Sequence, residues 1–138
     1  MDNVQLNWWA ILLATLANMM MGGLWYSGLL FGERWMALVG WSKDEAKEKQ
    51  ARGARWYPIV IPVSFVFASC LAVLIHGLHI DSILGGLKLG LLVGLGLMAV
   101  PGGPRNAFAG RPFGLYLINH GYWAISAVVL SLILAVWQ

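Results

Sequence analysis

The amino-acid sequence predicts an all-α fold, a bundle of four transmembrane helices. Of its 138 residues, 59% are hydrophobic and only 11% are charged, whereas a soluble domain carries about 25% charged residues. Such a chain lacks the charge to cover a water-facing surface. Because a hydrocarbon core about 30 Å thick is crossed by about 20 helical residues, we expect a single integral membrane domain, 1–138, with spans near residues 8–31, 56–76, 83–101 and 113–137.

The first span, residues 8–31, places polar and small residues on one face. Asn18 and Gly22 are followed at helical spacing by Trp25 and Tyr26. Polar groups inside hydrocarbon are costly and usually face other protein or a water-filled path. We therefore single out Asn18, Trp25 and Tyr26 as candidates for a site.

The first loop, residues 33–55, is strongly charged, with six basic and four acidic residues. Ser42 followed three residues later by Glu45 is a capping-box pattern, which marks the beginning of a helix. Two pairs of opposite charge follow at i, i+4 spacing: Glu45 with Lys49 and Glu48 with Arg52. We expect a short, solvated cytoplasmic helix that leads into the second span.

The third span, residues 83–101, contains a glycine ridge, defined as Gly86, Gly90 and Gly94. Glycines at intervals of four let two helix backbones approach closely. The ridge is expected to mark a helix contact, either within the subunit or between subunits.

Both ends of the third span carry turn signals. A tight turn is expected around residues 79–82, where Asp81 either caps the span or receives the Lys88 side chain. At the other end, proline and glycine are expected to stop the helix in the run Pro101-Gly102-Gly103-Pro104. The loop that follows contains two arginines expected to meet lipid phosphates rather than a substrate, Arg105 and Arg111.

The fourth span, residues 113–137, carries Asn119, His120 and Trp123. The first and fourth spans run in opposite directions, so Asn119 and His120 should meet Tyr26 at a similar depth. Two interpretations follow. In the first interpretation, these groups line a polar site, with Trp25 and Trp123 as apolar walls and His120 as a proton relay or pH sensor. Alternatively, they satisfy one another and hold the two spans together at about 0.6 kcal/mol per bond.

The distribution of charge predicts the orientation. Eight of the nine Lys and Arg residues lie in the first and third loops, and the positive-inside rule places such loops in the cytoplasm. Both termini are then outside, in a multi-pass protein of the cell membrane. Tryptophans that prefer the interface agree with this: Trp8, Trp9 and Trp137 at the outer side and Trp35, Trp41 and Trp56 at the inner side.

Five segments of the chain are distinctive: Asn7-Trp8-Trp9-Ala10, Gly23-Leu24-Trp25-Tyr26-Ser27, Leu30-Phe31-Gly32-Glu33-Arg34-Trp35-Met36, Gly110-Arg111-Pro112 and Leu117-Ile118-Asn119-His120-Gly121-Tyr122-Trp123. With these segments the chain resembles the small bacterial membrane proteins grouped as domain-of-unknown-function family 1761. The resemblance implies a four-span protein of a bacterial inner membrane without an established biochemical role, so it assigns no catalytic or binding residue. Small four-span multidrug transporters need an acidic residue in the first span, where this chain offers only Thr15 and Asn18.

No motif points to catalysis: there is no HExxH, no GxSxG and no carboxylate pair within a span. We therefore expect no enzyme activity and no cofactor. His76 and His79 beside Asp81 could hold a metal, but a polar turn explains them more simply, so no metal is expected. Nucleic-acid binding is not expected either, because the basic residues are confined to loops.

The first hypothesis for function is a small oligomeric transporter or channel-like protein with a polar and aromatic intramembrane site. Its partners would be the lipid bilayer, further copies of itself, and a small solute or proton. The alternative is a noncatalytic structural or accessory membrane subunit, in which the glycine ridge and the bonds between spans serve assembly.

Overall fold

The computed structural model describes residues 5–137, which are almost entirely helical and contain no strand. In chain order the elements are α1 (Trp8–Trp25), α2 (Gly32–Val39), α3 (Lys43–Ala51), the 3-10 turn η1 (Gly53–Trp56), α4 (Tyr57–Gly77), α5 (Ile83–Leu91), the π-helical η2 (Leu92–Ala99), α6 (Val100–Phe108) and α7 (Phe113–Val136). The segments long and apolar enough to cross a membrane are Trp8–Trp25, Gly53–Gly77, Ile83–Phe108 and Phe113–Val136. The predicted fold class is confirmed.

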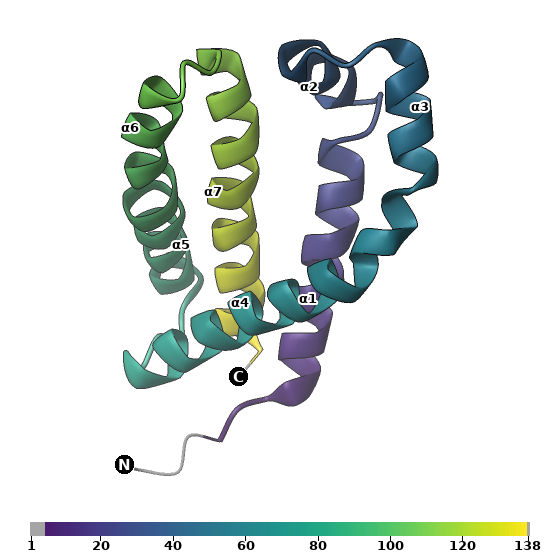
Figure 1. Ribbon diagram of the computed structural model, residues 1–138. Coiled ribbons are helices and arrows are strands. Elements are labelled where there is room, and N and C mark those ends of the chain that lie inside the picture. The colour runs from purple at the N-terminus through teal and green to yellow at the C-terminus, as the bar shows by residue number, and fades with distance from the viewer. Residues whose placement is uncertain (1–4, 138) are drawn as a thin grey trace.

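The helices pack around α7, which contacts α5, η2, α1 and α4. In Figure 1, α1 and α7 run lengthwise, α5 and α6 lie together on one side of α7, and α4 crosses the view obliquely. The beginning of α1 and the end of α7 lie at one end, whereas α2, α3 and the α6–α7 turn lie at the other. The two basic loops therefore share one end, here called the basic end. Which side of the membrane this end faces stays a prediction.

The first helix ends earlier than expected, at Trp25 rather than near residue 31. The chain reverses just after it, and the N–H of Gly32 donates to the Ser27 carbonyl over 2.9 Å. Gly32 approaches the Tyr26 and Ser27 carbonyls so closely that a Cβ could not fit. This reversal leads into α2 (Gly32–Val39), a helix that was not predicted, because residues 33–39 were expected to be loop.

The charged helix α3 begins as predicted, with a capping box between Ser42 and Glu45. The i, i+4 pair of Glu48 and Arg52 also forms, with 2.7 Å between carboxylate and guanidinium. Glu45 and Lys49, the second expected pair, form no close ion pair among the described residues. The Glu45 carboxylate accepts from the Ser42 N–H instead, and Lys49 Nζ lies 4.0 Å from the centroid of the Trp41 ring.

The turn between α4 and α5 lies where the sequence placed it, with His79 in the left-handed region at φ 51°. Ser82 rather than Asp81 caps α5, because the Ser82 hydroxyl accepts from the Gly85 N–H over 3.2 Å. Asp81 is therefore not the cap, one of the two roles considered for it.

The third span is longer than predicted, and the expected stop at Pro101-Gly102-Gly103-Pro104 is wrong, because α6 runs through it. Pro104 has no N–H to donate to the Val100 carbonyl one turn earlier. The neighbouring Ala99 carbonyl accepts from Tyr116 Oη of α7 over 2.9 Å. The helix ends instead at Phe108. Gly110 follows, with a positive φ of 63° that is typical of a glycine after a helix.

The glycine ridge packs within the chain, against α7. A Cβ placed at Gly90 would lie 2.5 Å from Val128 Cα, and one at Gly94 would lie 2.7 Å from Ala124 Cα. At Gly86 it would lie 2.8 Å from the Ser131 carbonyl oxygen. The ridge thus brings α5 and η2 against the α7 backbone, the first of the two contacts considered.

The hydrophobic core fills the half of the bundle near the termini. Its fully buried side chains include Ile11 of α1, Leu71 and Ile75 of α4, and Leu130 of α7. These helices leave little open space between them at this end. The larger polar cavity lies in the opposite half.

Candidate functional site

A cavity of about 420 Å³ lies near the basic end, between α1, α6 and α7. We call it the basic pocket and define it by its lining residues: Tyr26, Gly102, Arg105, Asn106, Ala109, Arg111, Asn119, His120 and Trp123. Four of the six residues singled out as site candidates therefore meet here. The lining contains two arginines and no acidic side chain.

Asn119 is held by two donors from different helices. Its Oδ1 accepts from Tyr26 Oη over 3.2 Å and from Trp35 Nε1 over 2.9 Å. An indole N–H can only donate, so this contact fixes which end of the Asn119 amide is the oxygen. Within residues 5–137, Asn119 Nδ2 makes no hydrogen bond, which leaves two N–H groups at the wall of the basic pocket to donate to a ligand.

His120 is fixed between α6 and α7. Its Nδ1 lies 3.1 Å from the Tyr116 carbonyl oxygen, which only accepts, so Nδ1 carries the proton in this contact. The Tyr116 ring packs on the imidazole with 4.5 Å between centroids. The far edge of the imidazole lies against Gly102, where a Cβ would collide with Nε2.

The two arginines of the basic pocket come from α6 and from the turn after it. Arg105 lies in the last turn of α6, and Arg111 follows Gly110 in the turn, where its carbonyl accepts from Asn106 Nδ2 over 3.1 Å. Among the described residues, the one ion pair joins Arg52 and Glu48. No carboxylate within residues 5–137 therefore neutralises Arg105 or Arg111.

Two predicted site residues lie outside the basic pocket. Trp25 donates from Nε1 to the Ile118 carbonyl over 3.0 Å and packs on Phe31, with 4.6 Å between ring centroids. It lines a different cavity, against Gly121 on another face of α7. The structure does not place Trp25 as a wall of the polar site.

Asn18 is 1% exposed and joins three helices. Its Nδ2 donates to Ser64 Oγ of α4 over 3.0 Å, and its Oδ1 accepts from Tyr122 Oη of α7 over 3.1 Å. Its polar atoms are satisfied by these neighbours, which agrees with the interpretation that such groups hold the spans together.

Sequence reasoning missed Gly102, Trp35 and the approach of Arg105 and Arg111 to the polar cluster. Gly102 was missed because the run of prolines and glycines around it indicated a turn rather than a close helix contact. Trp35 was interpreted as an interface anchor. One signal was available: Arg105 and Arg111 are the basic residues nearest in the chain to Asn119 and His120.

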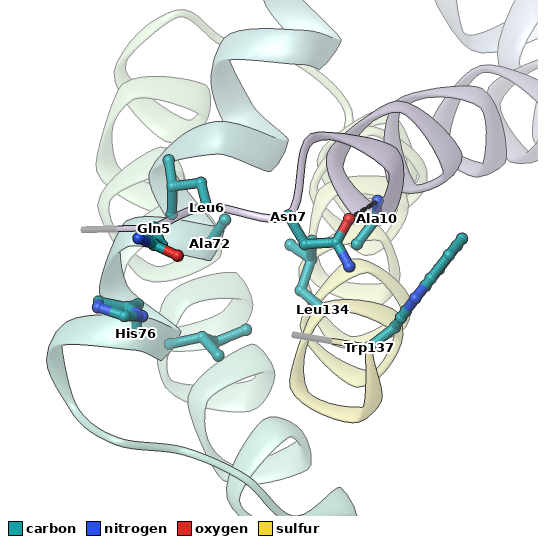
Figure 2. Close-up of a pocket in the computed structure, with 9 residues that line it drawn as sticks. Gln5, Leu6, Asn7, Ala10, Ala72, His76, Leu134 and Trp137 are labelled. Atoms are coloured by element: carbon teal, nitrogen blue, oxygen red, sulfur yellow. Dashed lines mark hydrogen bonds between the residues drawn. The ribbon is translucent and has the colours of Figure 1, made fainter. Parts of the chain in front are cut away.

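A second, much smaller cavity of about 30 Å³ lies at the other end of the bundle, with room for about one water molecule. Figure 2 shows Gln5, His76 and Trp137 around it, with the Asn7 side chain capping α1 through the Ala10 N–H. No three His, Cys, Asp or Glu side chains between residues 5 and 137 come close enough to hold a metal ion.

Comparison with known proteins places the chain in a family. No curated protein and no solved structure matches the chain. Residues 9–135, nearly the whole chain, match the family described as protein of unknown function (DUF1761). The match includes the spans that form the basic pocket. The resemblance seen in the sequence is thereby confirmed, and this chain belongs to the DUF1761 family.

Proposed function

We propose that this protein is a small membrane transporter whose substrate carries an anionic group and binds in the basic pocket. The observation that supports the proposal is the charge of that pocket, which has two guanidinium groups and no carboxylate in its lining. Charges of one sign in a cleft with low-dielectric walls concentrate ions of the opposite sign. An anion would neutralise Arg105 and Arg111 together.

The donors of the pocket narrow the chemistry of the substrate. Arginine presents a planar fork of N–H groups that matches phosphate and carboxylate oxygens. Asn119 adds donors at Nδ2, because its oxygen is already occupied by Tyr26 and Trp35. A phosphate or carboxylate group suits a site of this composition.

Passage across the membrane requires a rearrangement, because the half near the termini is filled by side chains such as Ile11 and Leu130. The π-helical segment η2 joins the packed α5 to α6, which forms one wall of the basic pocket. Segments of π-helix are irregular and frequently lie at functional sites. In this proposal α6 moves about η2, and His120 Nε2 takes up a proton that accompanies the anion.

The proposal includes the setting of the protein. The basic end faces the cytoplasm, so the basic pocket opens on the cytoplasmic side of a bacterial cell membrane. Four helices rarely enclose a pathway alone, so copies of the chain associate to complete it. No bond of the substrate is made or broken.

The alternative, a noncatalytic accessory subunit, depended in part on the glycine ridge as an assembly surface. The ridge instead packs against Val128 and Ala124 of the same chain. The basic pocket has no evident use in that alternative, so transport is the function we favour.

Proteoliposomes test the proposal with two probes. One preparation contains radiolabelled inorganic phosphate, whose efflux is measured. The other contains a fluorescent anionic phospholipid, whose passage between leaflets is followed by chemical quenching from outside. We expect at least one probe to move faster than in empty vesicles. We also expect the double variant Arg105→Gln, Arg111→Gln to lose the movement.

The matched control is Arg55→Gln, which removes a basic-end charge that does not line the pocket. This variant should behave like the wild type. The proposal fails if neither probe moves faster than in empty vesicles, or if the pocket variant and the control transport equally well.

A further inference from the structure

Another cavity adjoins the basic pocket and has a mostly apolar lining. It has a volume of about 450 Å³ and lies between α1, the first turns of α4, and α7. We call it the apolar groove. Its lining includes Met19 and Gly23 of α1 and Val60 and Val63 of α4. Val60 and Val63 are 43% and 50% exposed, so this groove presents hydrocarbon side chains to whatever fills it.

The two cavities share two side chains, Tyr26 and Trp123. Tyr26 is held by its hydrogen bond to Asn119. Trp123 packs edge-on against Phe67 of α4, with 5.8 Å between ring centroids. A single molecule that passes these shared walls would reach the arginines on one side and the apolar groove on the other.

The two cavities lie at the depths in the membrane that the head group and the acyl chain of a phospholipid occupy. Arg105 and Arg111 lie at the basic end, where α6 ends and α7 begins. The groove begins beside Tyr57, the first residue of α4, and aromatic residues of this kind favour the membrane interface. From Tyr57 to Val63 it runs about 9 Å along the helix, at 1.5 Å per residue, toward the middle of the bilayer.

The apolar groove also has room for an acyl chain beside α1. A Cβ added at Gly23 would meet nothing within 4 Å, so α1 presents bare backbone there. On the polar side, the charge of both arginines calls for an anion. A soluble anion would fill only the basic pocket, whereas a molecule with an anionic head and an apolar tail fills both cavities.

We propose that the substrate of this site is an anionic phospholipid, with its phosphate between Arg105, Arg111 and Asn119 and one acyl chain in the apolar groove. This inference rests on the proposed function, because it names the molecule that carries the anionic group. The lipid would enter from the leaflet at the basic end, and its acyl chain would pass between Tyr26 and Trp123.

The test measures how much phosphatidylglycerol remains bound to protein purified from vesicles of phosphatidylcholine and phosphatidylglycerol, by mass spectrometry of the intact complex. We expect wild type to retain phosphatidylglycerol in preference to phosphatidylcholine. Val63→Trp should fill the groove without touching the arginines, and retention should fall about tenfold, as for the loss of about 1.4 kcal/mol of binding free energy. Val66→Trp is the matched control, because Val66 is exposed on α4 but does not line the groove.

The source of the phosphate is tested in parallel by titrating delipidated protein with inorganic phosphate in a calorimeter. If Val63→Trp and Val66→Trp retain the same amount of lipid while both bind phosphate, the ligand is soluble phosphate. That result overturns this inference and leaves the proposed function standing.

The double variant Arg105→Gln, Arg111→Gln separates the remaining outcomes. We expect it to lose phosphatidylglycerol, with retention regained by Lys at both positions. If it retains lipid and binds phosphate as well as wild type, both proposals fail. If lipid binding depends on the groove and the arginines but neither vesicle probe moves, transport fails and the lipid site stands.

Discussion

His120 of α7 packs against Gly102 of α6, with the edge of its imidazole where a Cβ at position 102 would stand. The opposite side of the ring is fixed by the contact of Nδ1 with the Tyr116 carbonyl, at 3.1 Å. A glycine whose neighbours indicated a turn is therefore the residue that lets a site histidine fit between two helices. Both residues line the basic pocket, so this contact sets its shape.

Gly102→Ala should destabilise the protein by about 1–3 kcal/mol, because the new methyl group collides with His120. The measurement is the free energy of unfolding in detergent micelles. Gly96→Ala, in the same continuous span, is the control, since its Cβ would meet nothing closer than Leu92 Cδ1 at 3.7 Å. Equal stabilities of the two variants would show that His120 moves away at no cost.

Gly90→Ala should also destabilise by about 1–3 kcal/mol, for a different reason. Its Cβ would lie 2.5 Å from Val128 Cα, and backbone atoms cannot rotate away, so α5 must separate from α7. Unfolding titrations against Gly96→Ala measure the difference. A Gly90→Ala protein as stable as that control would contradict the close packing of the glycine ridge.

Asn18→Leu should cost about 1–3 kcal/mol, because the buried Ser64 hydroxyl loses the donor from Asn18 and Tyr122 Oη keeps only the backbone carbonyl of residue 18 as its acceptor. The control is Thr15→Val on the same helix, whose hydroxyl donates only to the Ile11 carbonyl of its own turn. That change should cost less than about 1 kcal/mol. If both variants unfold alike, the bonds of Asn18 do not hold the spans together.

The α3 helix should lose its cap in acid. The Ser42 backbone N–H, then the Ser42 side chain, and to a smaller extent the charge of Lys49, lower the pKa of the Glu45 carboxyl. Because the folded-state pKa is depressed, the cap contributes fully above the ordinary glutamate pKa of about 4.3. Its contribution is lost as pH falls through the lower, folded-state value.

Amide chemical shifts of residues 42–52 in micelles, followed while the pH is lowered, measure this loss. Glu45→Gln keeps a side-chain acceptor at the cap but has no carboxyl group at position 45, so the Ser42 amide shift should change less in acid than in the wild type, whereas Asp44 and Glu48 act alike in both proteins. If the Ser42 amide of the wild type responds to acid as it does in Glu45→Gln, the carboxylate does not stabilise the cap.

The predicted orientation can be tested with reporters at the C-terminal end. If the C-terminal end is outside, a fusion to alkaline phosphatase should be active, because this enzyme folds outside the cytoplasm. A fusion to green fluorescent protein should not fluoresce, because that protein folds inside the cytoplasm. A bright fluorescent fusion with an inactive phosphatase would reverse the orientation. It would also place the basic pocket on the outer side.

Much of the local structure follows from short stretches of sequence. The Ser42 and Glu45 capping box and the Glu48 and Arg52 pair form because their partners are one helical turn apart. The meeting of Tyr26 with Asn119 followed from comparing depths along two antiparallel spans, and the hydrogen bond between them confirms it.

The site was harder to predict, because distant segments decide it. Trp25 and Tyr26 are neighbours in the chain, yet one faces Phe31 and the other the basic pocket. Which of them joined the site depended on how α1 is rotated against α7. Spacing alone left that rotation open, and it also left open the partners of Asn18.

The order of amino acids was enough to predict a helical membrane protein with four spans and its basic loops at one end, because hydrophobicity and length act on each segment separately. The continuation of the third span through Pro101 and Pro104, where the Ala99 carbonyl accepts from Tyr116 of α7, became visible only in the packed structure. The same is true of the meeting of Arg105 and Arg111 with Asn119 and His120 in one pocket. The physical reason is the same in both cases: the partners belong to another helix, and packing alone brings them together.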